Sequence, residues 1–220
     1  MSEPEIAFLR DGPEVALLRD GPDDASDTFV LAHGAGGPMD SPFLDAVAGG
    51  LAARGIQVVR FEFAYMRQRR HGGARRAPDR EPRLRGEWLA VIDALGGGRR
   101  LVIGGKSMGG RMASMVADEA GARGLVCLGY PFHPPGSPQR LRTAHLRELA
   151  TPTLIVQGTR DPFGQPAEVE DYALSPRIRI AWIEDGDHSL VPRKSSGRTA
   201  QQNLAEAIDV IGGFTEGLPG

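Results

Sequence analysis

Residues 101–111, with the sequence LVIGGKSMGGR, constrain the fold of this chain more than any other stretch. The apolar start predicts a short buried strand, and residues that favour helix follow the last glycine. Between them, Gly105, Ser107 and Gly109 have the G-x-S-x-G spacing of a nucleophile elbow. This turn is so tight that side chains at its two glycine positions would clash with the neighbouring backbone. We therefore expect an exposed, nucleophilic Ser107, provided that a base and an oxyanion site lie beside it.

Two nucleotide-binding alternatives fail on spacing. A P-loop has a glycine five residues before its Gly-Lys pair, and here that position is Arg100. A dinucleotide-binding fingerprint beginning at Gly34-Ala-Gly36 requires a third glycine at position 39, which is Met39. Both glycine-rich stretches therefore need another explanation.

Composition narrows the class of protein. The 220 residues carry 26 basic and 28 acidic side chains, which argues against a nucleic-acid partner or a membrane partner for the whole protein. Cys127 is the only cysteine, so a disulfide framework is impossible, and its apolar surroundings predict a buried strand residue. The N-terminus lacks the pattern of a signal peptide, and no apolar run approaches the roughly 18 residues needed to span a bilayer. We expect a cytoplasmic protein with a single domain, residues 1–220.

Apolar and amphipathic segments alternate along the chain. An early pair of strands, joined by a turn at 11–13, predicts an antiparallel edge. The remaining pattern predicts an α/β fold, in which a mainly parallel sheet lies between two layers of helices. Strands are expected at 6–9, 15–18, 28–32, 56–63, 101–104, 125–130, 153–157 and 178–183, and helices at 42–51, 84–95, 108–119, 168–173 and 204–211.

Ligand sites in such sheets lie beyond the carboxyl ends of the strands. His188 follows the last strand and Asp161 follows the strand before it, so both can reach the edge that carries Ser107. We predict that His188 is the base and that Asp161 orients it. Asp185 and Asp187 are the alternative acids, but residues so near in sequence seldom point at the histidine ring.

With serine, aspartate and histidine in this order, the chain resembles the α/β-hydrolase superfamily. It is most similar to the small dienelactone-hydrolase-like branch, and within it to testis-expressed and chromatin-complex hydrolase-like proteins. Residues 104–111 (GGKSMGGR) and 129–135 (GYPFHPP) carry this resemblance, which extends over nearly the whole chain. It implies a core sheet of about eight strands. True dienelactone hydrolases have cysteine where this chain has Ser107, so dienelactone is not expected as the substrate.

The backbone N–H groups of Met108 and Ala35 are expected to form the oxyanion hole, with Gly36 as the alternative second donor. His33, just before that glycine-rich loop, is expected to be structural. The implied reaction is two-step acyl transfer on Ser107, with a small-molecule acyl substrate and no metal or organic cofactor. The alternatives are a non-catalytic interaction module with the same fold, and a thioesterase or peptidase with the same three side chains.

Two long segments are candidates for lining the site. Residues 131–151 stand where many α/β-hydrolases insert a cap domain, and their shortness predicts a minimal cap and an open site. Residues 65–85 form a polar loop whose eight arginines after position 66 are either simply solvated or attract an anionic partner. Lys106, next to the nucleophile, is expected to form a structural ion pair with an acidic core residue; the alternative is that it tunes the site. The sequence indicates no oligomeric state. The expected lining residues are Tyr65, Phe132, His133 and Phe163.

Overall fold

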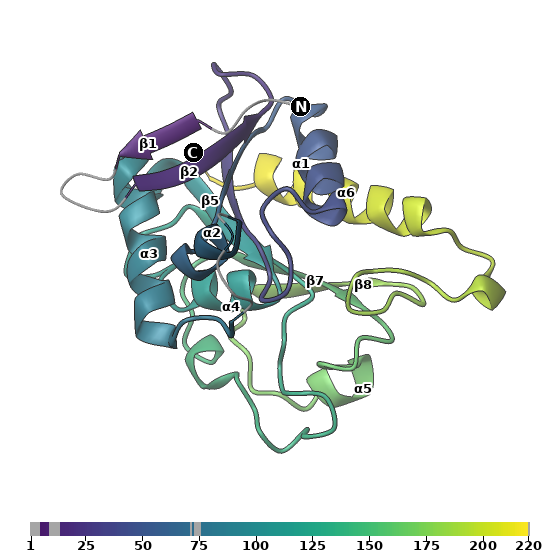
Figure 1. The fold of residues 1–220 in the computed structure, drawn as a ribbon. Helices are drawn as coiled ribbons and strands as arrows, with labels where there is room; N and C mark the ends of the chain where they lie inside the picture. Colours follow the sequence, from purple (N-terminus) through teal and green to yellow (C-terminus); the bar gives the residue numbers. More distant parts are fainter. Residues whose placement is uncertain (1–4, 9–13, 71, 73–75, 220) are drawn as a thin grey trace.

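The computed structural model describes residues 5–8, 14–70, 72 and 76–219. One eight-stranded sheet runs through the molecule in the order β1-β2-β4-β3-β5-β6-β7-β8 (Figure 1). The pairs β1–β2 and β2–β4 are antiparallel, and every other neighbouring pair is parallel. The predicted mainly parallel sheet of about eight strands with an antiparallel N-terminal edge is therefore confirmed.

None of the helices in the described ranges is both long and apolar enough to cross a bilayer.

The elements lie close to the positions predicted from the apolar pattern. The turn expected at 11–13 and Leu9 lie outside the described residues. The strands are β1 (Glu5–Phe8), β2 (Glu14–Asp20), β3 (Thr28–Ala32), β4 (Gln57–Phe61), β5 (Leu101–Lys106), β6 (Gly124–Leu128), β7 (Thr153–Gly158) and β8 (Ile178–Ile183). The helices are α1 (Pro42–Ala52), α2 (Ala64–Arg70), α3 (Glu81–Ala94), α4 (Met108–Ser114), α5 (Pro166–Val169) and α6 (Ala200–Glu216), with 3₁₀ turns η1 (Gly98–Arg100), η2 (Ala144–Leu146) and η3 (Lys194–Ser196).

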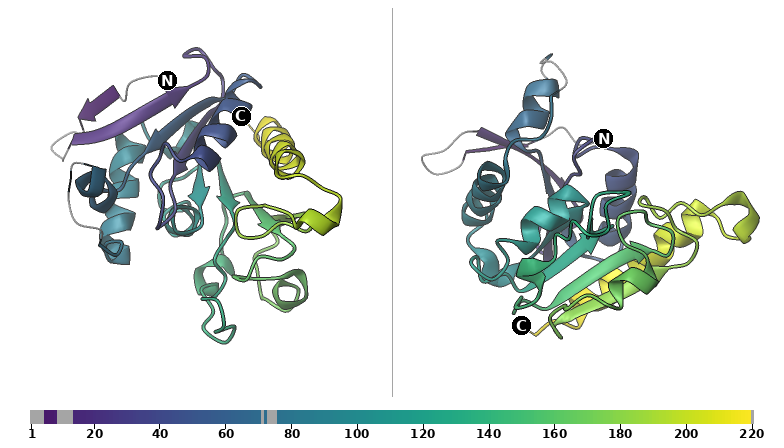
Figure 2. Two further views of the ribbon diagram at one scale, coloured as in Figure 1. Left: turned by 45° about the vertical axis from the view of Figure 1, so that its right-hand side comes forward. Right: turned by 90° about the horizontal axis from the view of Figure 1, so that it is seen from below.

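Helices cover both faces of the sheet (Figure 2). Successive side chains of a strand point to opposite faces, so neighbours in β5 join different cores. Ile103 belongs to the core that includes Trp88 of α3 and Met112 of α4, whereas Val102 belongs to the core that includes Leu51 of α1 and Ile211 of α6. The central strands β5, β6 and β7 are mostly apolar because both of their faces are buried, and the polar residues Lys106 and Gln157 lie near the carboxyl ends of β5 and β7.

The segment after β4 differs from the expected polar loop. Residues 64–70 form α2, which buries Tyr65 and Met66, and α3 begins at Glu81. Arg70 forms ion pairs with Asp40 and with Glu62, whose side chain is fully buried. Part of this segment, including His71, lies outside the described residues. The described part is thus mostly helical and not one continuous loop, and its ion-paired arginines Arg70, Arg76 and Arg83 are exposed to solvent.

Helix α4 is shorter than predicted. It ends at Ser114, five residues before the expected end at Glu119. The Ser114 hydroxyl donates a hydrogen bond to the Arg111 carbonyl, and the next two backbone bonds, from Met115 and Val116, span three residues in place of four. This tightening ends the helix because serine bonds to the backbone of the preceding turn.

Candidate active site

Ser107 lies in a strained turn between β5 and α4. Its φ is 52° and its ψ is −113°, a region that residues other than glycine rarely adopt. A Cβ on Gly105 would lie 2.5 Å from the Ala32 carbonyl oxygen, and a Cβ on Gly109 would lie 2.5 Å from that of His33. Both positions therefore require glycine, for the reason expected of a nucleophile elbow.

Three side chains meet at the carboxyl ends of β5, β7 and β8. His188 Nε2 lies 2.9 Å from Ser107 Oγ, and His188 Nδ1 lies 2.8 Å from Asp161 Oδ2. Because a carboxylate can only accept hydrogen bonds, the imidazole hydrogen is on Nδ1. Nε2 is then free to accept the hydrogen of the serine hydroxyl. The structure thus brings together all three residues predicted to do the chemistry.

Asp161 is fully buried and held by donors other than the histidine. Its Oδ1 accepts from the Phe163 N–H at 2.9 Å, and its Oδ2 accepts from the Gln157 side-chain amide at 3.0 Å. Gln157 also binds the backbone N–H and carbonyl of Tyr130. The sequence analysis missed this residue, although a glutamine near the end of an otherwise apolar strand was a usable signal. Gln157 ties the carboxylate to the end of β6.

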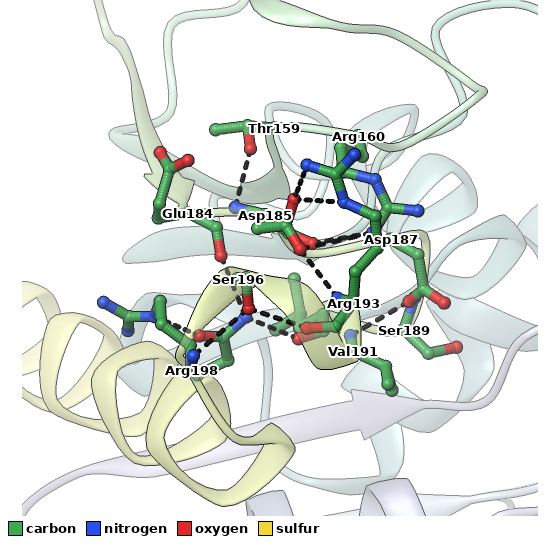
Figure 3. A network of polar contacts seen from close by, with 12 residues as sticks. Thr159, Arg160, Glu184, Asp185, Asp187, Ser189, Val191, Arg193, Ser196 and Arg198 are labelled. Atoms are coloured by element: carbon green, nitrogen blue, oxygen red, sulfur yellow. Dashed lines mark hydrogen bonds and ion pairs between the residues drawn. The ribbon is translucent and has the colours of Figure 1, made fainter.

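Asp185 and Asp187, the two alternative acids, form hydrogen bonds that stabilise the loop that carries His188 (Figure 3). Asp185 Oδ1 accepts from the Arg193 guanidinium at 2.8 Å, and this contact holds the pKa of Asp185 below its usual value. Asp187 Oδ1 accepts hydrogen bonds from two backbone N–H groups of its own loop. Neither carboxylate is the partner of the imidazole, and Asp161 takes that position.

His33 and Tyr65 hold the glycine-rich loop that follows β3. His33 Nε2 accepts from the Phe63 N–H at 3.1 Å, and its Nδ1 lies 2.7 Å from the Gly34 carbonyl oxygen. Burial lowers the pKa of His33, so the ring is neutral and Nδ1 is its donor. The Tyr65 hydroxyl donates to the Ala35 carbonyl at 3.1 Å. The structural role expected of His33 is confirmed.

A pocket of about 340 Å³ opens beside the serine. Ala35 and Gly36, the predicted oxyanion donors of this loop, both belong to its lining. Met108 is the first residue of α4, so its N–H is one of those that lack a partner within the helix. The lining consists of Gly34, Ala35, Gly36, Gly37, Ser41, Phe43, Leu44, Lys106, Ser107, His188 and Ser189.

Three of the four residues predicted to line the site lie elsewhere. Tyr65, Phe132 and His133 are at most 3% exposed, and none of them lines this pocket. The segment after β6 packs its large apolar side chains into the core on the α3 and α4 face, which removes them from the opening. Phe163 does lie at the site, with its ring centroid 4.3 Å from that of His188.

A second serine–histidine contact joins Ser114 and His145. The two side chains are 2.8 Å apart, and burial lowers the pKa of His145 to about 4. The Ser114 hydroxyl already donates to the Arg111 carbonyl and its residue is only 3% exposed, so a substrate cannot reach it. This pair is part of the packing.

The buried position predicted for Cys127 is confirmed.

Lys106 does not form the structural ion pair that was expected. Its ammonium donates to the backbone carbonyl of His188 and lies 5.7 Å from the centroid of the Phe43 ring. Within the described ranges, no carboxylate forms an ion pair with it. The expectation was wrong because the lysine points into the pocket that Ser107 also lines.

Comparisons with known proteins agree with this fold. A family model described as an alpha/beta hydrolase domain matches residues 25–216. A lid-less α/β serine hydrolase from Xanthomonas campestris shares 22% identity at a TM-score of 0.69, over 100% of this chain and 97% of that one. A dienelactone hydrolase from Anabaena variabilis shares 21% identity at a TM-score of 0.73, over 99% of both chains. These structures share the fold, and the family match shows that the chain belongs to the alpha/beta hydrolase domain family.

Proposed function

We propose that this protein is a serine hydrolase that cleaves ester-type acyl bonds through an acyl-enzyme on Ser107. The observation that carries the proposal is the unbroken hydrogen-bonded chain from Ser107 Oγ through the His188 ring to Asp161. Membership of the alpha/beta hydrolase domain family supports hydrolase activity in general. We also propose that the chain is a member of the dienelactone-hydrolase-like branch and of its testis-expressed subgroup, because residues 104–111 and 129–135 resemble those proteins.

The proposed reaction has two steps. Ser107 Oγ attacks the acyl carbonyl while His188 Nε2 takes the hydroxyl proton, and Asp161 stabilises the imidazolium that forms. His188 then returns the proton to the leaving alcohol, and the acyl group stays on the serine. In the second step His188 takes a proton from water as the water attacks the acyl carbonyl, and it then gives this proton to Ser107 Oγ as the bond to the acyl group breaks and the acid leaves.

The negative charge that develops on the substrate oxygen needs backbone donors. We assign this role to the N–H of Met108 and the N–H of Ala35, with Gly36 as the alternative to Ala35. Two observations support this assignment: Ala35 and Gly36 line the same pocket as Ser107, and Met108 is the first residue of α4. Each such donor contributes about 3 kcal/mol in the transition state of comparable enzymes.

Labelling with a fluorophosphonate, followed by intact-mass measurement, tests the proposal. Such reagents need an activated serine, so the wild-type protein should gain one adduct and Ser107→Ala should gain none. Ser114→Ala is the matched control, because it removes the other serine that contacts a histidine and should leave labelling unchanged. Folded wild-type protein that gains no adduct would instead support the non-catalytic interaction module.

A thioesterase or a peptidase with the same three side chains would also be labelled. A panel of matched ester, thioester and amide substrates separates these activities. We expect the largest kcat/KM for the ester, the bond named in the proposal, and the smallest for the amide, because a pocket of about 340 Å³ suits a small acyl group better than a peptide chain. A larger kcat/KM for the thioester or the amide would replace the ester in the proposal.

A further inference from the structure

Lysine is rare in this protein, and one of its lysines immediately precedes the nucleophile. Lys106 and Lys194 are the only lysines among 26 basic side chains. Lys194 is exposed in η3, away from the lining of the pocket. Lys106 is mostly covered and lines the pocket together with Ser107. An ammonium in such a place is costly unless something compensates its charge.

Few groups of the described protein offset the cost of covering the positive charge of Lys106. The His188 carbonyl is its hydrogen-bond acceptor, and the Phe43 ring lies near it. An ammonium has three donors, and the described part of the chain supplies this one acceptor for them. A Cβ on Gly129 would lie 2.9 Å from Nζ, so the glycine leaves the space that the ammonium occupies. The remaining donors are free for a group in the pocket.

The charges nearest to Lys106 are already engaged. Asp161 is bound to the His188 ring, and Asp187 binds backbone N–H groups of its loop. From α1 and its N-cap, the pocket receives the uncharged side chains of Ser41, Phe43 and Leu44. Among the described residues no acidic side chain lines the pocket, so an anionic ligand would meet the Lys106 ammonium and no like charge from them.

We propose that Lys106 makes the pocket selective for acyl substrates that carry a carboxylate, by pairing its ammonium with that group beside Ser107. The inference rests on the proposed function and names its substrate class. A cavity of about 340 Å³ suits a short-chain half-ester of a dicarboxylic acid. Partial burial strengthens the attraction, because fewer water molecules screen the two charges.

The pairing should also depend on pH. Burial lowers the pKa of Lys106 to about 8, while the charges of Asp161 and Asp187 oppose that shift. Lys106 is therefore charged at pH 7 and loses its charge as the pH rises through 8. The preference for an anionic substrate should decline over the same range.

The test compares kcat/KM for two esters of equal length, the 4-nitrophenyl half-ester of glutaric acid and 4-nitrophenyl valerate. The ratio of these values, anionic over neutral, should fall about tenfold in Lys106→Met, as expected for one partly buried charge pair. Lys106→Arg should retain most of the ratio at pH 7 and keep it at pH 9. Lys194→Met is the matched control, and its ratio should equal that of the wild type.

An equal fall of both kcat/KM values in Lys106→Met would overturn the proposal, because it would mean that Lys106 acts only through the His188 carbonyl. A wild-type enzyme that hydrolyses valerate and shows no preference would overturn it too. If the wild type hydrolyses neither ester and takes no fluorophosphonate, it is the proposed function that has failed.

A binding measurement on the unaltered protein covers the case in which Lys106→Met does not fold. Reductive methylation near pH 8, mapped by peptide mass spectrometry, reports each lysine separately. Glutarate should protect Lys106 and leave Lys194 reactive, whereas valeramide should protect neither. Equal protection by the two compounds, or no protection of Lys106 by glutarate, would contradict the proposal.

Discussion

The imidazole Nε2 of His188 lies 2.9 Å from the hydroxyl of Ser107, although 81 positions separate the two residues in the chain. They meet because Ser107 follows β5 and His188 follows β8, and the strands from β5 to β8 run parallel in one sheet. The carboxyl ends of parallel strands lie at the same edge of the sheet, so the strand order brings these two distant residues within hydrogen-bonding distance.

Removing the nucleophile should abolish turnover. Ser107→Ala is expected to reduce kcat by a factor on the order of 10⁴ or more, because it removes the hydroxyl that forms the acyl-enzyme. The measurement is hydrolysis of 4-nitrophenyl acetate by purified protein, with thermal unfolding as the check on folding. Full activity in a folded Ser107→Ala protein would show that the chemistry occurs elsewhere.

Replacing the orienting acid should impair the reaction while leaving the site intact. Asp161→Asn keeps the size of the side chain, but its amide can donate to His188 Nδ1 and so favours the wrong tautomer. We expect kcat to fall by about 10⁴, as in other enzymes with this arrangement. Activity within a few-fold of the wild type would exclude Asp161 as the orienting residue. Asp187→Asn, which leaves the imidazole contact unchanged, is the comparison.

The turn at Ser107 should not tolerate a methyl group at position 109. Gly109→Ala places a Cβ 2.5 Å from the His33 carbonyl oxygen, so the backbone must shift and the free energy of unfolding should fall by about 1–3 kcal/mol. Gly49→Ala is the matched control, because it lies in α1 with no atom within 4 Å of the new Cβ. That change should stabilise the protein by roughly 0.5–1 kcal/mol. Equal urea midpoints for the two variants would contradict the packing argument.

Two histidines, the buried His33 and the partly buried His145, should make the free energy of unfolding depend on pH. Burial lowers the pKa of His145 to about 4 and lowers that of His33, so the unfolded chain binds more protons than the folded protein. Their contribution is therefore complete above the unfolded pKa, roughly 6.5, and declines as the pH falls below it; that of His145 is lost as the pH falls toward 4. Urea unfolding at pH 7 and pH 5 measures this. His145→Gln should show a smaller loss between these two values, and an unchanged loss would be inconsistent with a neutral, partly buried His145.

Much of this architecture was predictable from local patterns. The strands at 28–32 and 178–183 match β3 and β8 residue for residue, because short, mostly apolar runs bounded by polar or turn residues fit a strand. The positions of Ser107, Asp161 and His188 followed from the rule that such strands present their carboxyl ends at one edge. The number of domains and the cytoplasmic location stay predictions.

The remainder depends on contacts that no local pattern encodes. Phe132 was predicted to line the site, yet an aromatic residue in a loop is equally able to fill the core, and here it does. Helix α2 was missed because its three arginines make the segment look like a solvated loop. Lys106 donates to a backbone carbonyl, and because every residue has one, the sequence does not indicate which carbonyl is the acceptor.

The most direct test of the account is to trap the covalent intermediate. Wild-type protein that is turning over 4-nitrophenyl acetate is quenched in acid, and its peptides are mapped by mass spectrometry. The account predicts one acetyl group, on Ser107, that appears within a turnover and disappears once the substrate is exhausted. Turnover with no acetylated serine, or with the acetyl group on Ser114, would contradict it.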